Sequence, residues 1–245
     1  MITRLVVCLI PLLFQFSAFG QNWGGGVDEE QLHFGFTFQY ITSEYKILKK
    51  GNWRQKYQDP LTGDFVPSAT DSLISISSPS TPGFGLGFVS DLRLGSHANL
   101  RFTPALAFTD RLLDYNYRDS SFFQQKKVQA TMVDLPIGIK IKSDRRMNYR
   151  AYFIAGIKYS MDIISKKKTD DEAFAPIEKL VKNNRNILSY EAGIGLDPYF
   201  EFFKLSPEIK LSNSFNNVLK SENHPYSSPL NKLFLRNLQF SLYFE

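Results

Sequence analysis

The fold of this chain is decided by segments with a period of two, and residues 132–141, which read MVDLPIGIKI, are the clearest of them. Large aliphatic side chains fill the odd positions from Val133 to Ile141, whereas the even positions include Asp134, Gly138 and Lys140. Successive side chains of a β-strand point to opposite faces. The segment therefore predicts a strand with one apolar face and one face of mostly small or charged residues.

The same alternation recurs along the chain. In residues 31–40, for example, Phe34, Phe36, Phe38 and Tyr40 share one face. The alternating segments are 31–40, 84–89, 100–108, 132–141, 150–159, 188–197, 203–211 and 237–244. Eight segments of about ten residues match the number and length of strands in the smallest transmembrane β-barrels.

A soluble eight-stranded barrel of the lipocalin kind would alternate as well, so the composition of the two faces must decide. A soluble barrel fills its interior with large side chains. Here one face carries many glycines and charges, which can line a narrow lumen but cannot fill a dry core, and the other face suits lipid. Closure also removes the unpaired strand edges that a bilayer forbids. We therefore expect an all-β, eight-stranded antiparallel transmembrane β-barrel.

The lengths of the connections alternate in the same sense. Short connections are expected at 95–98, 143–148 and 197–201, and long ones at 43–82, 112–127, 162–186 and 212–232. Outer-membrane barrels have short periplasmic turns and long extracellular loops. The chain is therefore expected to span the outer membrane many times, with both ends in the periplasm.

The first 20 residues are typical of a secretory signal peptide. A positively charged residue precedes an apolar stretch at 5–16, and the small-residue pattern of Ala18 and Gly20 follows. We expect residues 1–20 to be removed and residues 21–30, which contain three successive glycines, to form a flexible periplasmic lead-in. Residues 31–245 are expected to form a single outer-membrane barrel domain.

The composition excludes several classes of protein. Cys8, the only cysteine among the 245 residues, lies in the segment that we expect to be removed, which leaves no basis for a disulfide scaffold, a cysteine zinc site or a cysteine nucleophile. No apolar run after the N-terminus approaches the ~20 residues that a membrane helix needs. The 29 basic residues exceed the 24 acidic ones by too little to support nucleic-acid binding.

No catalytic or metal-binding pattern stands out. His33, His97 and His224 fall in different parts of the expected topology, so they cannot converge on a metal. A hydrolase of the Ser-His-acid type would need His224 with a neighbour such as Ser227 or Glu222, a combination that loops contain by chance. We expect a protein that is not an enzyme and has no cofactor and no metal, and the sequence identifies no small-molecule substrate.

Charges on the lumen face are expected to form ion pairs. Counting back from the tight turns places Asp134 near Lys158 and Glu191 near Lys210. Charges inside a barrel too narrow for bulk water must be paired or hydrogen-bonded. We therefore expect a filled lumen with a structural role for these pairs, and no general pore.

The third long connection offers a candidate partner-contact site. We interpret the three lysines at 166–168 as part of a solvated surface or of a surface that contacts anionic headgroup sugars. Pro176 suits the first turn of a short helix, on which Ile177, Leu180 and Val181 would form one face. We expect this apolar face to be exposed and to contact a partner.

Several stretches also carry a family resemblance, which covers most of the chain and is weakest in the long connections. These stretches are Pro82–Gly87, Leu100–Pro104, Asp110–Tyr115, Asp134–Pro136, Tyr152–Ser160, Tyr190–Asp197, Lys204–Lys210 and Asn216–Leu219. Together they resemble the PorT/SprT family of Bacteroidetes outer-membrane barrels. The resemblance implies a component required for protein export by the type IX secretion system, and for gliding motility where it occurs, with outer-membrane lipid and other secretion components as partners. It supplies no catalytic residues.

Two functions therefore stay open at this point. The first is an accessory barrel of the secretion machine that acts by protein contact. The second is a small structural or adhesin-type outer-membrane barrel whose loops bind surface ligands. The sequence does not identify the contacted subunit, the oligomeric state or the step that the protein serves.

Overall fold

The structure is a computed structural model that describes residues 31–59, 63, 73–118, 123–163, 175–176 and 178–245. The expected signal peptide and lead-in lie outside these residues. The described strands are β1 (Leu32–Lys49), β2 (Leu73–Ser77), β3 (Thr81–Arg93), β4 (Ala98–Phe102), β5 (Ala105–Thr109), β6 (Arg111–Tyr117), β7 (Phe123–Val128), β8 (Thr131–Lys142), β9 (Tyr149–Asp162), β10 (Asn186–Pro198), β11 (Leu205–Ser214) and β12 (Leu230–Phe244). Among the described residues no helix has the length and apolar character that a transmembrane helix needs.

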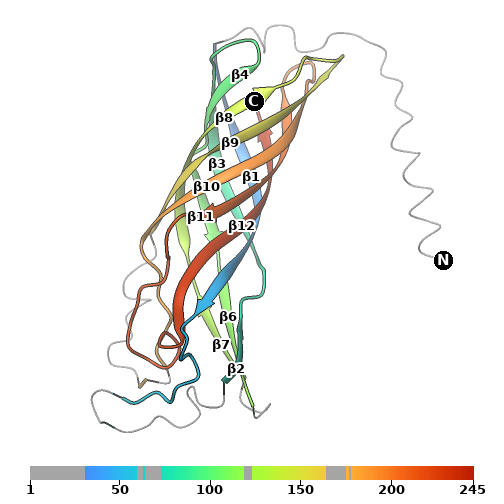
Figure 1. Cartoon of the computed structure of the whole chain (residues 1–245). Helices are drawn as coiled ribbons and strands as arrows, with labels where there is room; N and C mark the ends of the chain where they lie inside the picture. Colours follow the sequence, from blue (N-terminus) through green and yellow to red (C-terminus); the bar gives the residue numbers. More distant parts are fainter. Residues whose placement is uncertain (1–30, 60–62, 64–72, 119–122, 164–174, 177) are drawn as a thin grey trace, which may run out of the picture.

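The main sheet closes on itself as an antiparallel ring (Figure 1). Its order is β1, β12, β11, β10, β9, β8, then β4 with β5, then β3, which pairs with β1 again. Because β4 and β5 occupy one position in the ring, the barrel has eight strands, as the sequence predicts. The closing contact of β1 with β12 includes stacked rings of Phe36 and Phe244, whose centroids are 4.9 Å apart.

The break between β4 and β5 falls at Thr103 and Pro104. Proline has no backbone N–H to donate to the ladder. The Pro104 carbonyl still accepts from the Phe88 amide at 2.9 Å, and the Thr103 amide donates to the Pro136 carbonyl at 3.2 Å. The interruption is therefore local, and the strand continues in the same position of the ring.

The two faces of the barrel strands divide as predicted. The outward face is apolar and exposed, with Phe34 at 70% and Ile137 at 41% of full exposure. The inward face carries buried polar and charged residues, such as Lys140 at 0%. Since no aqueous protein would expose so continuous an apolar surface, this surface is the one that faces lipid.

Two long connections are more ordered than the sequence suggests. The prediction of a loop over 112–127 is wrong, because β6 continues β5, and β7 leads into β8, as one hairpin beyond the ring. The connection predicted at 43–82 is also shorter, because β1 runs to Lys49 and β2 pairs with β6. Figure 1 shows this three-stranded sheet of β2, β6 and β7 at the end of the barrel opposite the short turns.

Candidate functional site

A network of buried charges fills the half of the lumen nearer the short turns. We call it the lumen network, and its members are Asp91, Arg101, Lys140, Tyr152, Glu191, Asp197, Lys204, Glu208, Lys210, Tyr243 and Glu245. Arg101 of β4 lies at its centre. Its Nη2 donates at 2.8 Å to both Asp91 Oδ2 and Glu245 Oε1, and its Nη1 donates at 3.3 Å to Glu208 Oε2.

Two lysines extend the network around the ring. Lys140 Nζ of β8 lies 2.7 Å from Asp197 Oδ2 of β10, and 3.9 Å from the centre of the Tyr152 ring. The Asp197 carboxylate also accepts from the Ser206 hydroxyl at 2.6 Å. Lys204 forms an ion pair with Glu245. The pair of Lys140 with Asp197 joins strands that are not neighbours, since β9 lies between β8 and β10, so the network bridges the lumen as well as lining it.

The two ion pairs expected from the sequence lie further along the lumen. Lys158 Nζ is 3.4 Å from Asp134 Oδ2, and Lys210 Nζ is 3.0 Å from Glu191 Oε1. Lys210 also lies 3.1 Å from Glu208 Oε1 and so belongs to the lumen network. The geometry is consistent with the structural role that we proposed for these pairs.

The sequence reasoning did not single out Arg101, Lys140, Asp197, Glu208 or Glu245 as site residues. The sequence did contain a signal for four of them, because Arg101, Lys140, Asp197 and Glu208 lie on the polar, lumen-facing side of the alternating segments. Their partners could not be read from the turns, since Arg101 and Glu208 are 107 residues apart and belong to strands that do not pair.

Aromatic hydroxyls complete the filling of the lumen. Tyr152 and Tyr243 donate to Glu208 Oε2 and Oε1 at 2.9 and 3.0 Å. Beside them, the middle of the lumen is bounded by Gln39, Thr103, Ala105, Asp134, Pro136, Lys158, Glu191, Lys210, Gln239 and Tyr243. These residues enclose a space that has no room for a water molecule.

The other half of the lumen holds a cluster of apolar side chains, with buried polar ones such as Ser43 and Asn237 among them. Its buried side chains come from barrel strands, such as Ile41, Met132 and Leu235, and from the connections beyond them, such as Leu219 and Tyr226. We call this group the outer apolar core. Since it lies at the end opposite the short turns, it forms a second barrier in series with the lumen network.

Tyrosines tie the β6–β7 hairpin to the connection between β11 and β12. The Tyr115 hydroxyl donates to the Tyr226 carbonyl at 2.7 Å, and the two rings meet edge to face at 5.2 Å. Burial raises the pKa of the Tyr226 hydroxyl to about 12, and it also raises the pKa of the Tyr115 hydroxyl. Both hydroxyls therefore remain protonated donors at any physiological pH.

The predicted apolar helix face is not found. Ile177 lies outside the described residues, and residues 178–183 form no helix, with Asn183 bridged to Leu219 instead. Val181 is 3% exposed and belongs to the outer apolar core, while Leu180 is half-buried. The prediction of an exposed contact face is wrong for Val181, because one face of this extended segment packs inward.

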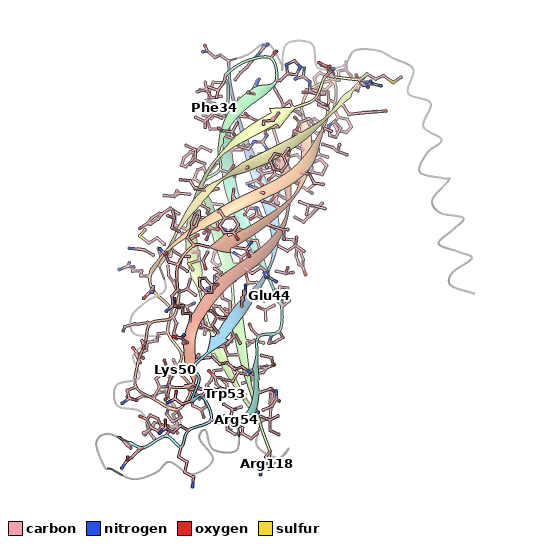
Figure 2. All side chains as sticks on the ribbon, viewed as in Figure 1. Phe34, Glu44, Lys50, Trp53, Arg54 and Arg118 are labelled. Carbon is pink, nitrogen blue, oxygen red and sulfur yellow. The ribbon has the colours of Figure 1, made fainter. Side chains whose placement is uncertain are left out.

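Cations gather around an indole ring beyond the end of β1. Lys49 Nζ lies 4.4 Å and the Arg54 guanidinium 4.5 Å from the centre of the Trp53 ring. Arg54 also donates to the Leu73 and Ile74 carbonyls of β2. Figure 2 shows Trp53 and Arg54 at the end of the molecule opposite Phe34, close to Lys50. We call Lys49, Lys50, Trp53 and Arg54 the outer cationic cluster.

The histidines lie apart in the fold. His33 pairs in register with Asp91, His97 bonds to Asp144 at 2.9 Å in the short turns, and His224 is buried in the connection between β11 and β12. Hydrogen bonding to His97 lowers the pKa of the Asp144 carboxyl. The described part of the chain has no group of three or more His, Cys, Asp and Glu residues that could hold a metal.

Solved structures that are similar to this chain include those of three outer-membrane or surface proteins. Among solved structures, OprG from Pseudomonas aeruginosa is similar over 86% of this chain and 93% of its own, with 10% identity and a TM-score of 0.43. Neisserial surface protein A is similar over 87% and 98%, with 9% identity and a TM-score of 0.41. Ail of Yersinia pestis, solved with a heparin analogue, is similar over 88% and 99%, with 9% identity and a TM-score of 0.38.

Comparison with curated protein sequences gave no significant match. The family model described as outer membrane protein beta-barrel domain, by contrast, matches residues 19–220, which is most of the chain. A match of this extent, together with a closed ring of eight antiparallel strands and an apolar outer surface, shows that this protein is an outer-membrane β-barrel and belongs to the outer membrane protein beta-barrel domain family.

Proposed function

We propose that this protein is a non-enzymatic outer-membrane barrel that acts by contact with other proteins. The observation that carries the proposal is the filled lumen. The lumen network closes one half, and the outer apolar core closes the other. A barrel that cannot pass solutes must act through its rim, its connections or its lipid-facing surface.

The machine that it serves is, on this proposal, the type IX secretion system. The support is the resemblance of its strand segments to the PorT/SprT family, such as the stretch Tyr190–Asp197 in β10. Its partners would be outer-membrane lipid and other secretion components. In gliding species the same role would extend to export of surface adhesins.

A deletion strain tests this function. Loss of the gene should abolish export of many unrelated cargo proteins that carry a C-terminal sorting domain, as measured by mass spectrometry of the culture medium. Expression of the full chain from a plasmid should restore that export. Normal export from the deletion strain would contradict the proposal.

The outer cationic cluster favours a second candidate, an adhesin-type barrel whose connections bind anionic surface ligands. Lys49 at the end of β1 and Arg54 beyond it share one indole ring. On this reading the double variant Lys49→Gln with Arg54→Gln should reduce attachment of cells to a sulfated glycan surface while export of other proteins is unchanged. If the double variant leaves attachment unchanged, the adhesin candidate fails.

A further inference from the structure

Arg111 is a buried cation in the half of the lumen that contains the outer apolar core. It stands at the first position of β6, faces inward and is 1% exposed. Its neighbours in the outer apolar core include Leu113 and Val128, the latter opposite Arg111 in the register of β6 with β7. Such a site is costly for a guanidinium unless an anion or several hydrogen-bond acceptors accompany it.

The described residues supply little of that compensation. The Nη2 atom of Arg111 donates to Thr109 Oγ1 at 3.2 Å, but its Nε and Nη1 atoms are buried without any hydrogen-bond partner. No described carboxylate lies within ion-pair distance of the guanidinium. Asp162 of β9 acts electrostatically on the neighbouring Tyr45. This contrasts with Arg101, which meets three carboxylates in the other half of the same lumen.

A second donor lies beside the guanidinium. Arg111 lies over the ring of Tyr45, with 6.0 Å between the guanidinium carbon and the ring centre. The Tyr45 oxygen accepts a hydrogen bond from Asn183 Nδ2 and also interacts with the Arg111 guanidinium, and its own O–H is left as a donor. The group at this position is therefore cationic and rich in donors, with too few acceptors.

We propose that Arg111 and Tyr45 form a binding site for a small oxyanion. The ligand is a carboxylate or a phosphate group, because the planar guanidinium fork fits two oxygens of either kind. It would accept from the free Nε–H and Nη1–H bonds of Arg111 and from the Tyr45 hydroxyl. The site lies at the end of the barrel opposite the short turns, so a ligand would come from the cell surface. This inference is independent of the proposed role in secretion.

Binding can be measured by its effect on unfolding. A ligand that binds the folded barrel alone raises the denaturant midpoint in a saturable way. Purified full-length barrel in detergent is unfolded in urea with increasing sodium acetate, or with increasing sodium phosphate, and sodium chloride holds the ionic strength constant. We expect a saturable rise in the midpoint with at least one of the two anions, and the anion that acts identifies the ligand as carboxylate or phosphate.

Variants assign the effect to the site. Arg111→Gln should reduce the apparent affinity at least tenfold, and Tyr45→Phe should reduce it severalfold. Arg118→Gln is the matched control, because it removes an exposed arginine of the same hairpin that Figure 2 shows at the far end of the molecule. This control should keep the response of the wild type.

A measurement on the wild type alone tests the proposal even if a variant does not fold. Exchange of phosphate between the solution and the site should broaden the ³¹P resonance of the phosphate. Excess acetate should narrow this resonance again if both anions bind at the same site. A midpoint that does not saturate with either anion, or an equal response from Arg111→Gln, would overturn the proposal.

Discussion

At the scale of single residues, burial decides what an ion pair contributes. The Arg101 side chain is 1% exposed among Asp91, Glu208 and Glu245, whereas Arg236 and Glu44 form a surface pair at 3.3 Å with side chains 49% and 37% exposed. Arg101→Met should lower the free energy of unfolding by about 3–5 kcal/mol, because it leaves buried carboxylates without their cation. Arg236→Met should cost about 0–1 kcal/mol. Urea unfolding of the two variants in lipid vesicles measures the difference, and equal losses would contradict it.

Two glycines that face each other across β8 and β9 differ in the space around them. A Cβ atom at Gly156 would lie 2.2 Å from the Ile137 carbonyl oxygen, whereas one at Gly138 would lie 3.0 Å from the Ala155 carbonyl oxygen. We therefore expect Gly156→Ala to destabilise the barrel by about 1–3 kcal/mol. Gly138→Ala should stay within about 1 kcal/mol of the wild type. The midpoint of thermal unfolding on gels checks the order, and a larger loss at Gly138 would reverse it.

The sequence shows which residues face inward but not which of them meet. Asp134 and Lys158 could be placed together because both lie on strands joined by a short turn, which fixes the register by counting. Arg101 and Glu208 meet across the lumen, and that distance depends on the closure and tilt of the whole ring. A pattern of period two carries no information on that closure.

At the scale of elements, strand existence was easier to predict than strand length. The hairpin of β6 and β7 was missed because a bilayer needs only about ten residues per strand. Its alternation nevertheless continues beyond that length, with Leu113, Tyr115 and Tyr117 all buried. These side chains pack into the outer apolar core, and this packing stabilises the hairpin beyond the part of the strands that contacts lipid. The prediction of a helix near Val181 was wrong because the apolar pattern there is short. Such a short pattern fits a helix and an extended segment equally.

The turn between β8 and β9 offers a test at the same scale. Met147 has a φ of 53°, and it is the only described residue other than glycine with a positive φ. It occupies the first of the two positions between the bridged residues Arg146 and Tyr149, which is the position where a type II′ turn favours glycine.

Met147→Gly should therefore change the free energy of unfolding by between zero and an increase of about 1 kcal/mol. The gain from relief of strain is partly offset because glycine has greater freedom in the unfolded chain. Urea unfolding measures the change. Met147→Ala, which keeps the strain, serves as the control and should not be stabilising. A loss of stability in the glycine variant alone would contradict the assignment of this turn.

At the scale of the whole molecule, the orientation in the membrane can be tested with single cysteines. In a Cys8→Ser background, Gln58→Cys and Lys220→Cys should react with a membrane-impermeant thiol reagent on whole cells, because both positions lie in long connections. Ser96→Cys and Arg145→Cys, in the short turns, should react only after the cells are opened. The reverse pattern would invert the topology.

The conductance of the barrel tests the filled lumen directly. Two barriers of different chemistry stand in series, since the lumen network fills one half of the lumen with paired charges and the outer apolar core packs apolar side chains into the other half. The purified protein in planar bilayers should therefore show no large, stable conductance.

The serial arrangement makes a sharper prediction for a variant. Arg101→Gln disturbs the first barrier by removing the cation that Asp91, Glu208 and Glu245 share, but it leaves Ile41, Met132 and the rest of the outer apolar core in place. This variant should lose stability without gaining conductance in planar bilayers. Protease protection of the variant in lipid vesicles serves as the control that it still inserts into a membrane. A large current from the wild type would show that the lumen is open, and a current from Arg101→Gln alone would show that the lumen network is the only barrier.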